Sequence, residues 1–158
     1  MNSTMAGANV TIEGERGIRV ERIFDARRER VWRAFTEADQ VAEWWGRGNK
    51  LVVEKQELVR GGHWRFVEHV DGQTHGFEGR YRVVEPPRRL EATFEYDGMP
   101  GHVVITDMIL EDLGDGRTRL VSTMTFFTGA DREGMLKSGM EKGMNESYAA
   151  LDRLLARG

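Results

Sequence analysis

The hydrophobic period of this chain changes along its length, and the order of the changes limits what it can fold into. Residues 18–24 alternate apolar and charged side chains, as a half-buried strand does. Residues 28–35, and a second stretch after Thr36, place apolar residues at helical spacing. The sequence from 51 to 127 then returns to strand-like patterns. We therefore expect a strand, two short helices and a mostly β region, in that order.

Six strand-like runs make up the β region, and Gly, Pro and Asp turn signals separate them. The runs are 51–59, 63–70, 74–85, 89–96, 103–111 and 118–127. In residues 131–155 the apolar side chains recur every three or four positions, so we expect one long helix there. These elements predict an α+β fold: a seven-stranded, curved antiparallel sheet around a long C-terminal helix, with two short helices after the first strand.

A single domain accounts for the chain. Its length of 158 residues is typical of one domain, and no linker-like stretch divides it. Residues 1–17 are small and polar, so we expect a flexible lead-in followed by one domain over 18–158. Apolar residues make up 39% of the chain and charged residues 31%, which permits a sizeable core and disfavours a membrane protein.

Charge and cysteine content exclude several function classes. The net charge is −3 with both signs interspersed, so we expect no nucleic-acid partner. Without cysteine there is no disulfide, thiolate nucleophile or thiolate metal site. The first residues lack the basic and apolar regions of a secretory signal, so we expect a cytoplasmic protein without membrane insertion.

Two turn signals predict strand registers. A two-residue turn at Asp71-Gly72 places an aromatic pair on one face of a hairpin and an opposite-charge pair on the other. Its pairs are Glu68–His75, Phe66–Phe77 and Trp64–Gly79 on the aromatic face, and Arg65–Glu78 on the opposite face. The turn at Gly114-Asp115-Gly116 pairs Leu110–Leu120, Met108–Ser122 and Thr106–Met124. We expect the aromatic face to be the inner one, and alternation places Tyr81 and Val83 there as well.

The inner face predicts a wall of aromatic, methionine and small residues opposite the C-terminal helix. The candidate ligand-binding residues are Trp45, Trp64, Phe66, Glu68, His75, Phe77, Tyr81, Phe94, Met108, Met124, Met140, Met144 and Tyr148. Such a stripe is more often a packed core than a pocket, although flexible methionines suit a pocket that reshapes around apolar guests.

The sequence gives little support for a catalytic or a metal-binding site. His63 and His69 stand six positions apart on one strand, about 20 Å, so they cannot share an ion, and we expect no metal and no cofactor. Glu68 opposite His75 is the one acid/base arrangement in the sequence. At the rim of a sheet, such a pair is more often a solvated ion pair than a functional group. No nucleophile elbow or phosphate-binding loop is present. We therefore assign no catalytic residue.

Several motifs resemble one family. They are Phe24-Asp25-Ala26, Val31-Trp32, Phe35-Thr36, Trp44-Trp45-Gly46, Gly61-Gly62-His63-Trp64, Val84-Glu85-Pro86-Pro87 and Leu113-Gly114-Asp115-Gly116. In this order they resemble the Aha-type family, named for the activator of the heat-shock-protein-90 ATPase, of the START/birch-pollen-allergen (SRPBCC) superfamily. The resemblance implies a helix-grip fold. Arg27 and Arg47 stand where relatives often have proline, and Met144 where many have tryptophan; the first two are loop changes and the third alters the inner wall.

The resemblance leaves the function open, because the superfamily includes lipid and hormone binders, cyclases and co-chaperone domains. The leading hypothesis is a non-catalytic binder of a small apolar or aromatic molecule between sheet and helix. One alternative is a cyclase- or dehydratase-type enzyme in which Glu68, His75 or Tyr81 handles protons. Others are a co-chaperone domain with a chaperone partner and a stress-response or regulatory protein with a filled core. The sequence also leaves homodimer formation open.

Overall fold

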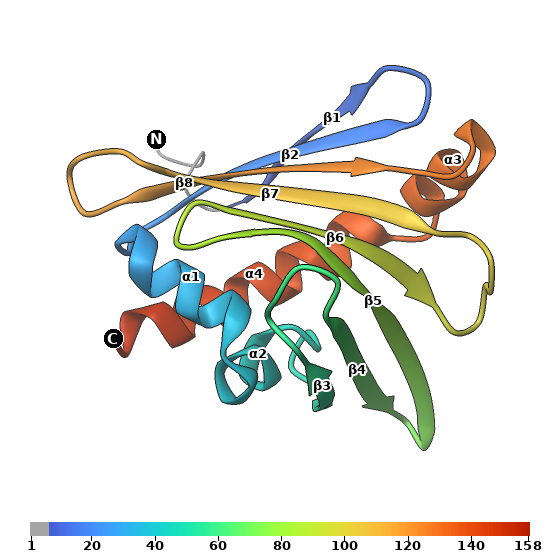
Figure 1. Ribbon diagram of the computed structural model, residues 1–158, viewed down its shortest axis with the longest axis horizontal. Helices are drawn as coiled ribbons and strands as arrows, with labels where there is room; N and C mark the ends of the chain where they lie inside the picture. Colours follow the sequence, from blue (N-terminus) through green and yellow to red (C-terminus); the bar gives the residue numbers. More distant parts are fainter. Residues whose placement is uncertain (1–6) are drawn as a thin grey trace.

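One antiparallel sheet bends around the C-terminal helix (Figure 1), in the computed structural model, which describes residues 7–158. The strand order is β1-β2-β8-β7-β6-β5-β4-β3. The strands are β1 (Asn9–Glu13), β2 (Gly17–Phe24), β3 (Lys50–Gln56), β4 (His63–Val70), β5 (Gln73–Glu85), β6 (Arg89–Tyr96), β7 (Val104–Asp112) and β8 (Thr118–Thr125). The helices are α1 (Arg28–Thr36), α2 (Ala38–Trp44), α3 (Gly129–Lys137) and α4 (Met140–Ala156). The expected α+β architecture is confirmed.

The predicted number of strands is wrong, because the sheet has eight strands rather than seven. The additional strand, β1, lies inside the expected lead-in and pairs with β2 from Asn9↔Glu21 to Glu13↔Gly17. Most of β1 is exposed at the sheet edge, and Ile12 is 62% exposed, so its short sequence carries no clear burial pattern. Residues 1–6 of the expected lead-in lie outside the described residues.

The predicted single helix over 131–155 is also wrong, because α3 and α4 are separate helices. Gly139 adopts a left-handed conformation with φ 85°, which ends the helical hydrogen-bond pattern between them. Helical spacing continues across the break, and Gly134 and Gly143 remain helical, so the pattern alone does not show where the chain turns. Of these two helices, only α4 buries residues, among them Tyr148 and Leu151.

Both predicted registers are confirmed. Asp71 and Gly72 have φ of 51° and 78° in the β4–β5 turn, and Phe66 faces Phe77 across it. The β7–β8 pairs are also those expected from the second turn. One inward assignment fails after Tyr81, where a bulge inserts an extra residue into β5. As a result Val84, rather than Val83, packs against the core.

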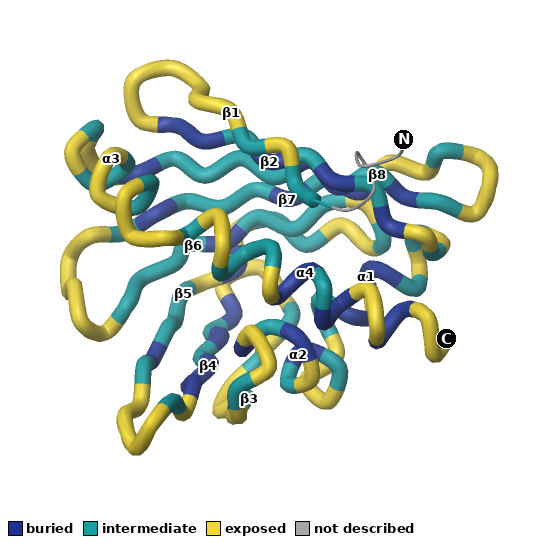
Figure 2. The backbone as a smooth tube through the Cα atoms, turned by 180° about the vertical axis from the view of Figure 1, so that it is seen from behind, coloured by how far each residue is buried: buried dark blue, intermediate teal, exposed yellow. Residues whose placement is uncertain are grey.

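Two hydrophobic clusters lie between the sheet and the helices. Figure 2 shows the buried backbone segments of the strands and of α4. The larger joins β2, β7 and β8 to α1 and α4, with Phe24 and Leu151 fully buried. The smaller lies under β3, β4, β5 and β6 and includes Trp64 and Phe66. Trp45, Val84, Leu90 and Phe94 pack against both clusters. The core is therefore continuous along α4 and the loop after α2.

An ion pair between the buried Arg22 and the half-exposed Asp152 attaches α4 to the sheet. The guanidinium of Arg22 on β2 donates two hydrogen bonds to the Asp152 carboxylate on α4, at 2.8 and 2.7 Å. The same guanidinium lies 4.7 Å from the Phe24 ring centroid and 5.5 Å from that of Tyr148. Its position on the inner face of β2 thus combines charge pairing with aromatic packing.

Candidate functional site: an aromatic face between the sheet and helix α4

Six aromatic rings form one connected group on the inner face, which we call the inner aromatic cluster. It consists of Trp45, Trp64, Phe66, Phe77, Phe94 and Tyr96. Trp45 contacts Phe66 and Phe77 with ring centroids 5.2 and 5.1 Å apart. Phe77 in turn lies 5.5 Å from Phe94 and 5.2 Å from Tyr96. The cluster joins the loop after α2 to strands β4, β5 and β6.

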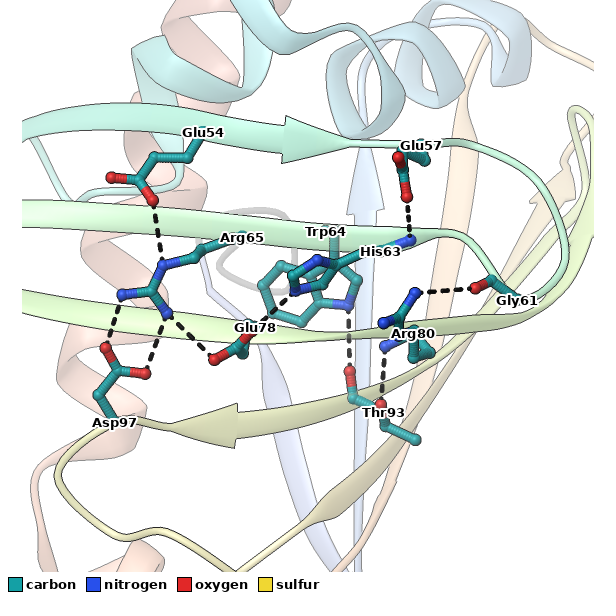
Figure 3. A network of polar contacts seen from close by, with 10 residues as sticks. All are labelled: Glu54, Glu57, Gly61, His63, Trp64, Arg65, Glu78, Arg80, Thr93 and Asp97. Carbon is teal, nitrogen blue, oxygen red and sulfur yellow. Dashed lines mark hydrogen bonds and ion pairs between the residues drawn. The ribbon is translucent and has the colours of Figure 1, made fainter.

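Gly79 makes room for the ring of Trp64, which is its register partner on β4. A Cβ atom at position 79 would lie 1.8 Å from the Thr93 carbonyl oxygen and 2.8 Å from Trp64 Nε1. The indole N–H of Trp64 donates to that same carbonyl oxygen at 3.1 Å (Figure 3). A glycine here is therefore a steric requirement for the position of Trp64.

The inner aromatic cluster is only partly covered. Trp64 and Phe66 are buried, whereas Trp45, Phe77 and Phe94 retain intermediate exposure. Met124, Met140 and Met144 are also partly exposed and pack against the larger core cluster. Apolar side chains thus face the space between sheet and α4 without complete burial.

Arg47, Asn49 and Glu68 form a polar group beside the aromatic rings. Glu68 is 3% exposed and accepts hydrogen bonds from Arg47 Nε at 3.1 Å, Arg47 Nη2 at 2.9 Å and Asn49 Nδ2 at 2.9 Å. The Arg47 stem passes α4 at Gly143, where an added Cβ would lie 3.3 Å from Arg47 Cδ. Arg47 therefore bridges β4 and α4.

The expected exposed pair of Glu68 with His75 is wrong in its contacts, although the two residues face each other in the register. Glu68 is buried and bound by Arg47 and Asn49, while His75 Nδ1 lies 2.8 Å from the Tyr96 hydroxyl. All three partners, Arg47, Asn49 and Tyr96, come from segments outside the β4–β5 hairpin, so the hairpin register could not reveal them.

The remaining candidates lie deeper in the core. Met108 and Tyr148 are buried in the larger cluster, and burial raises the pKa of Tyr148 to about 12. Tyr81 is buried in the smaller cluster, where its hydroxyl accepts a hydrogen bond from Gln56 Nε2 at 3.2 Å. Burial also raises the pKa of Tyr81.

Sequence reasoning missed Arg47, Asn49 and Tyr96 as site residues. The sequence indicates Arg47 only as a loop change and gives Tyr96 no binding role. The available signal was a cation between two glycines directly after the Trp44-Trp45 pair. That pattern suggests a tight loop, but nothing in it identifies Glu68 as the partner.

The opposite face of β3 to β6 carries an ion-pair network (Figure 3). Arg65 contacts Glu54, Glu78 and Asp97, and His63 Nε2 lies 2.7 Å from Glu78. Hydrogen bonding to Arg65 lowers the pKa of Asp97. These side chains lie on the face away from the aromatic rings, so we assign the network to the sheet rather than to the candidate site.

Two hollows lie away from the inner aromatic cluster. One, of about 560 Å³, is lined by Gly7, Ala8, Asn9, Glu21, Arg22, Ile23 and Arg119. The other, of about 300 Å³, is lined by Arg27, Glu29, Asp112, Gly114 and Gly116. Within residues 7–158, no group of three or more His, Asp or Glu side chains could hold a metal ion. No helix in this part of the chain is long and apolar enough to cross a membrane.

An antiparallel sheet bent around a C-terminal helix, with two short helices near its start, is consistent with the helix-grip class. The family model described as "Activator of Hsp90 ATPase homolog 1-like protein" matches residues 25–156. The chain therefore belongs to this family, as its motifs indicated.

Solved structures support the fold. A Rhodobacter sphaeroides protein is 28% identical with a TM-score of 0.88, covering 96% of this chain and 99% of its own. A protein from Arthrobacter aurescens is 24% identical with a TM-score of 0.85, covering 95% and 92%. One from Mycobacterium smegmatis is 18% identical with a TM-score of 0.82, covering 93% and 95%. None of the three carries a named activity, and no curated protein matches the chain.

Proposed function

We propose that the protein binds a small apolar, aromatic molecule against the inner aromatic cluster, between the sheet and α4. The observation that carries the proposal is the incomplete burial of Phe77, Phe94 and Trp45 on a face directed toward the helix. When a guest covers partly exposed apolar side chains, the removal of their surface from water favours binding by about 25 cal/mol per Å². An aromatic guest also makes edge and stacking contacts with these rings.

Partly exposed methionines on α4 allow the face to adapt. Met140 and Met144 lie in the first turns of α4 and are partly exposed. Because methionine has an unbranched, flexible side chain, it rearranges at low cost around guests of different shape. The two hollows described above lie away from the aromatic rings. Space for a guest at the rings would therefore be made by movement of these side chains.

The geometry favours binding over proton-transfer catalysis. An enzyme of the cyclase or dehydratase type would use Glu68, His75 or Tyr81 on its substrate. Glu68 is instead bound by Arg47 and Asn49, His75 contacts Tyr96, and Tyr81 contacts Gln56. Each candidate acid or base is engaged with a different partner, so the three do not form one catalytic group.

Fluorescence titration with N-phenyl-1-naphthylamine, a neutral aromatic probe, tests the proposal. We expect saturable binding that weakens at least tenfold in Phe94→Ala, because truncation removes one ring of the binding face. Phe127→Ala is the matched control, since Phe127 is 62% exposed and stands outside the cluster. Absence of probe binding, or equal affinity for wild type and Phe94→Ala, would contradict the proposal.

A further inference from the structure

We propose that the aromatic molecule carries an acidic group, such as a carboxylate or sulfonate, and that Arg47 binds it. This inference rests on the proposed function and adds the class of ligand. It follows from the unused donors of Arg47, from its place beside the aromatic rings and from the arrangement of its partner Glu68.

Arg47 has donors to spare. Its Nε and Nη2 bind the Glu68 carboxylate, whereas Nη1 has no hydrogen-bond partner within residues 7–158. The side chain of Arg47 is 41% exposed, while that of Glu68 is 4% exposed. Glu68 therefore holds the Nε and Nη2 donors, while the Arg47 side chain as a whole keeps substantial exposure. Guanidinium groups bind planar acidic groups through paired N–H donors.

The accessible guanidinium lies at one end of the inner aromatic cluster. Arg47 follows Trp45 by two residues, and Trp45 contacts Phe66 and Phe77. Glu68, which holds Arg47, follows Phe66 by two residues on the same face of β4. A molecule whose ring packs against Trp45 and Phe77 would thus carry its substituent toward Arg47.

His75 adds a second donor at the same end. It faces Glu68 in the β4–β5 register, and its Nδ1 contacts the Tyr96 hydroxyl. When Tyr96 donates to Nδ1, Nε2 carries the ring proton, and Nε2 has no partner in the described part of the chain. In that tautomer two donors, Arg47 Nη1 and His75 Nε2, remain available near a carboxylate that already accepts hydrogen bonds from Arg47 and Asn49. This arrangement favours an acceptor on the ligand rather than a donor.

The backbone of Arg47 supports a functional reason for its position. Its φ of 59° is in the left-handed region, which residues with a side chain adopt only at a cost in free energy. The glycine at position 143 leaves space for the Arg47 stem to cross toward β4. An arginine–glutamate pair of which only the glutamate is buried is by itself weak evidence for stability. The conformation and the pair together fix the guanidinium between sheet and helix.

A matched pair of probes tests the acidic group: 8-anilinonaphthalene-1-sulfonate and N-phenyl-1-naphthylamine, which has the same rings without the sulfonate. The variants are Arg47→Met/Glu68→Gln and Glu68→Gln. The double variant avoids leaving the Glu68 carboxylate buried without its partner. Arg88→Met is the control, because Arg88 pairs with Glu85 at an exposed turn outside the cluster. Circular dichroism and thermal unfolding establish that each variant is folded.

We expect wild type to bind the sulfonated probe at least tenfold more tightly than the neutral one, equal to about 1.4 kcal/mol. The double variant should lose this preference while retaining affinity for the neutral probe. Glu68→Gln should strengthen sulfonate binding, because it removes the negative charge that Arg47 now balances. Arg88→Met should match wild type. Equal affinity of wild type and the double variant for the sulfonated probe overturns the role of Arg47 and leaves the proposed function standing. Failure of wild type to bind either probe overturns both.

Discussion

Replacing Asp152 by alanine should loosen α4 from the sheet more than an ordinary surface substitution does. The carboxylate accepts two hydrogen bonds from Arg22, whose side chain is only 2% exposed. Arg22 Nε has no hydrogen-bond partner among the described residues, so Asp152 supplies the main compensation for a charge buried between Phe24 and Tyr148. Removing the carboxylate leaves that charge unpaired.

The expected cost follows from the exposure of the two partners. Breaking a fully buried pair costs about 3–5 kcal/mol. Asp152 is 45% exposed, so water replaces part of the lost interaction, and we expect about 2–3 kcal/mol. For a domain of this size that corresponds to a fall in Tm of about 4–12 °C.

Urea unfolding of wild type, Arg22→Met, Asp152→Ala and the double variant measures the coupling. The double variant should lose at least 1 kcal/mol less than the sum of the single losses, because methionine leaves no charge for Asp152 to balance. Glu111→Ala is the control. This change breaks the ion pair of Glu111 with Arg119, in which both side chains are half-exposed. It should cost less than about 1 kcal/mol. Additive losses within about 0.5 kcal/mol would refute the coupling between β2 and α4.

Two further predictions concern Gly79 and Tyr148. Gly79→Ala should destabilise the fold by about 1–3 kcal/mol in urea unfolding, because the added Cβ meets the Thr93 carbonyl oxygen. Gly134→Ala is the control: it lies at an open helix position and should be neutral or stabilising. Equal effects at both sites would contradict the packing of Trp64. Burial raises the pKa of Tyr148 to about 12, above about 10 in the unfolded chain, so its contribution is complete below pH 10 and is lost as the pH rises to 12. Between pH 8 and pH 11, wild type should lose about 1.4 kcal/mol more than Tyr148→Phe, and parallel losses would count against a buried, neutral phenol.

Local signals determined much of the architecture. The Asp71-Gly72 turn has the backbone conformation that its residue types favour, so the pairs of Phe66 with Phe77 and Glu68 with His75 follow from the sequence. The change from alternating to helical periods likewise predicts the order of strands and helices. Family membership followed from motifs that keep their order along the chain.

Tertiary structure decided what local patterns leave open. Strand β1 forms because it pairs with β2. Most of its residues are exposed, so its short sequence has no clear burial pattern that would predict a strand. Gly139 breaks the helix, whereas Gly134 and Gly143 do not. Because α3 packs against β2 and α4 packs against α1 and α2, the position of the break depends on these tertiary contacts. The bulge after Tyr81 shifts which valine faces inward.

The candidate site shows the same division. Alternation places the aromatic rings on one face, since a strand's period is a local property. The partner of Glu68 is Arg47, 21 residues away in a loop, and not the residue opposite it in the hairpin. A long side chain reaches whichever buried group the packed fold brings near, and burial of the Glu68 carboxylate makes a strong donor necessary. Only the three-dimensional packing of loop, sheet and helix determines which donor that is.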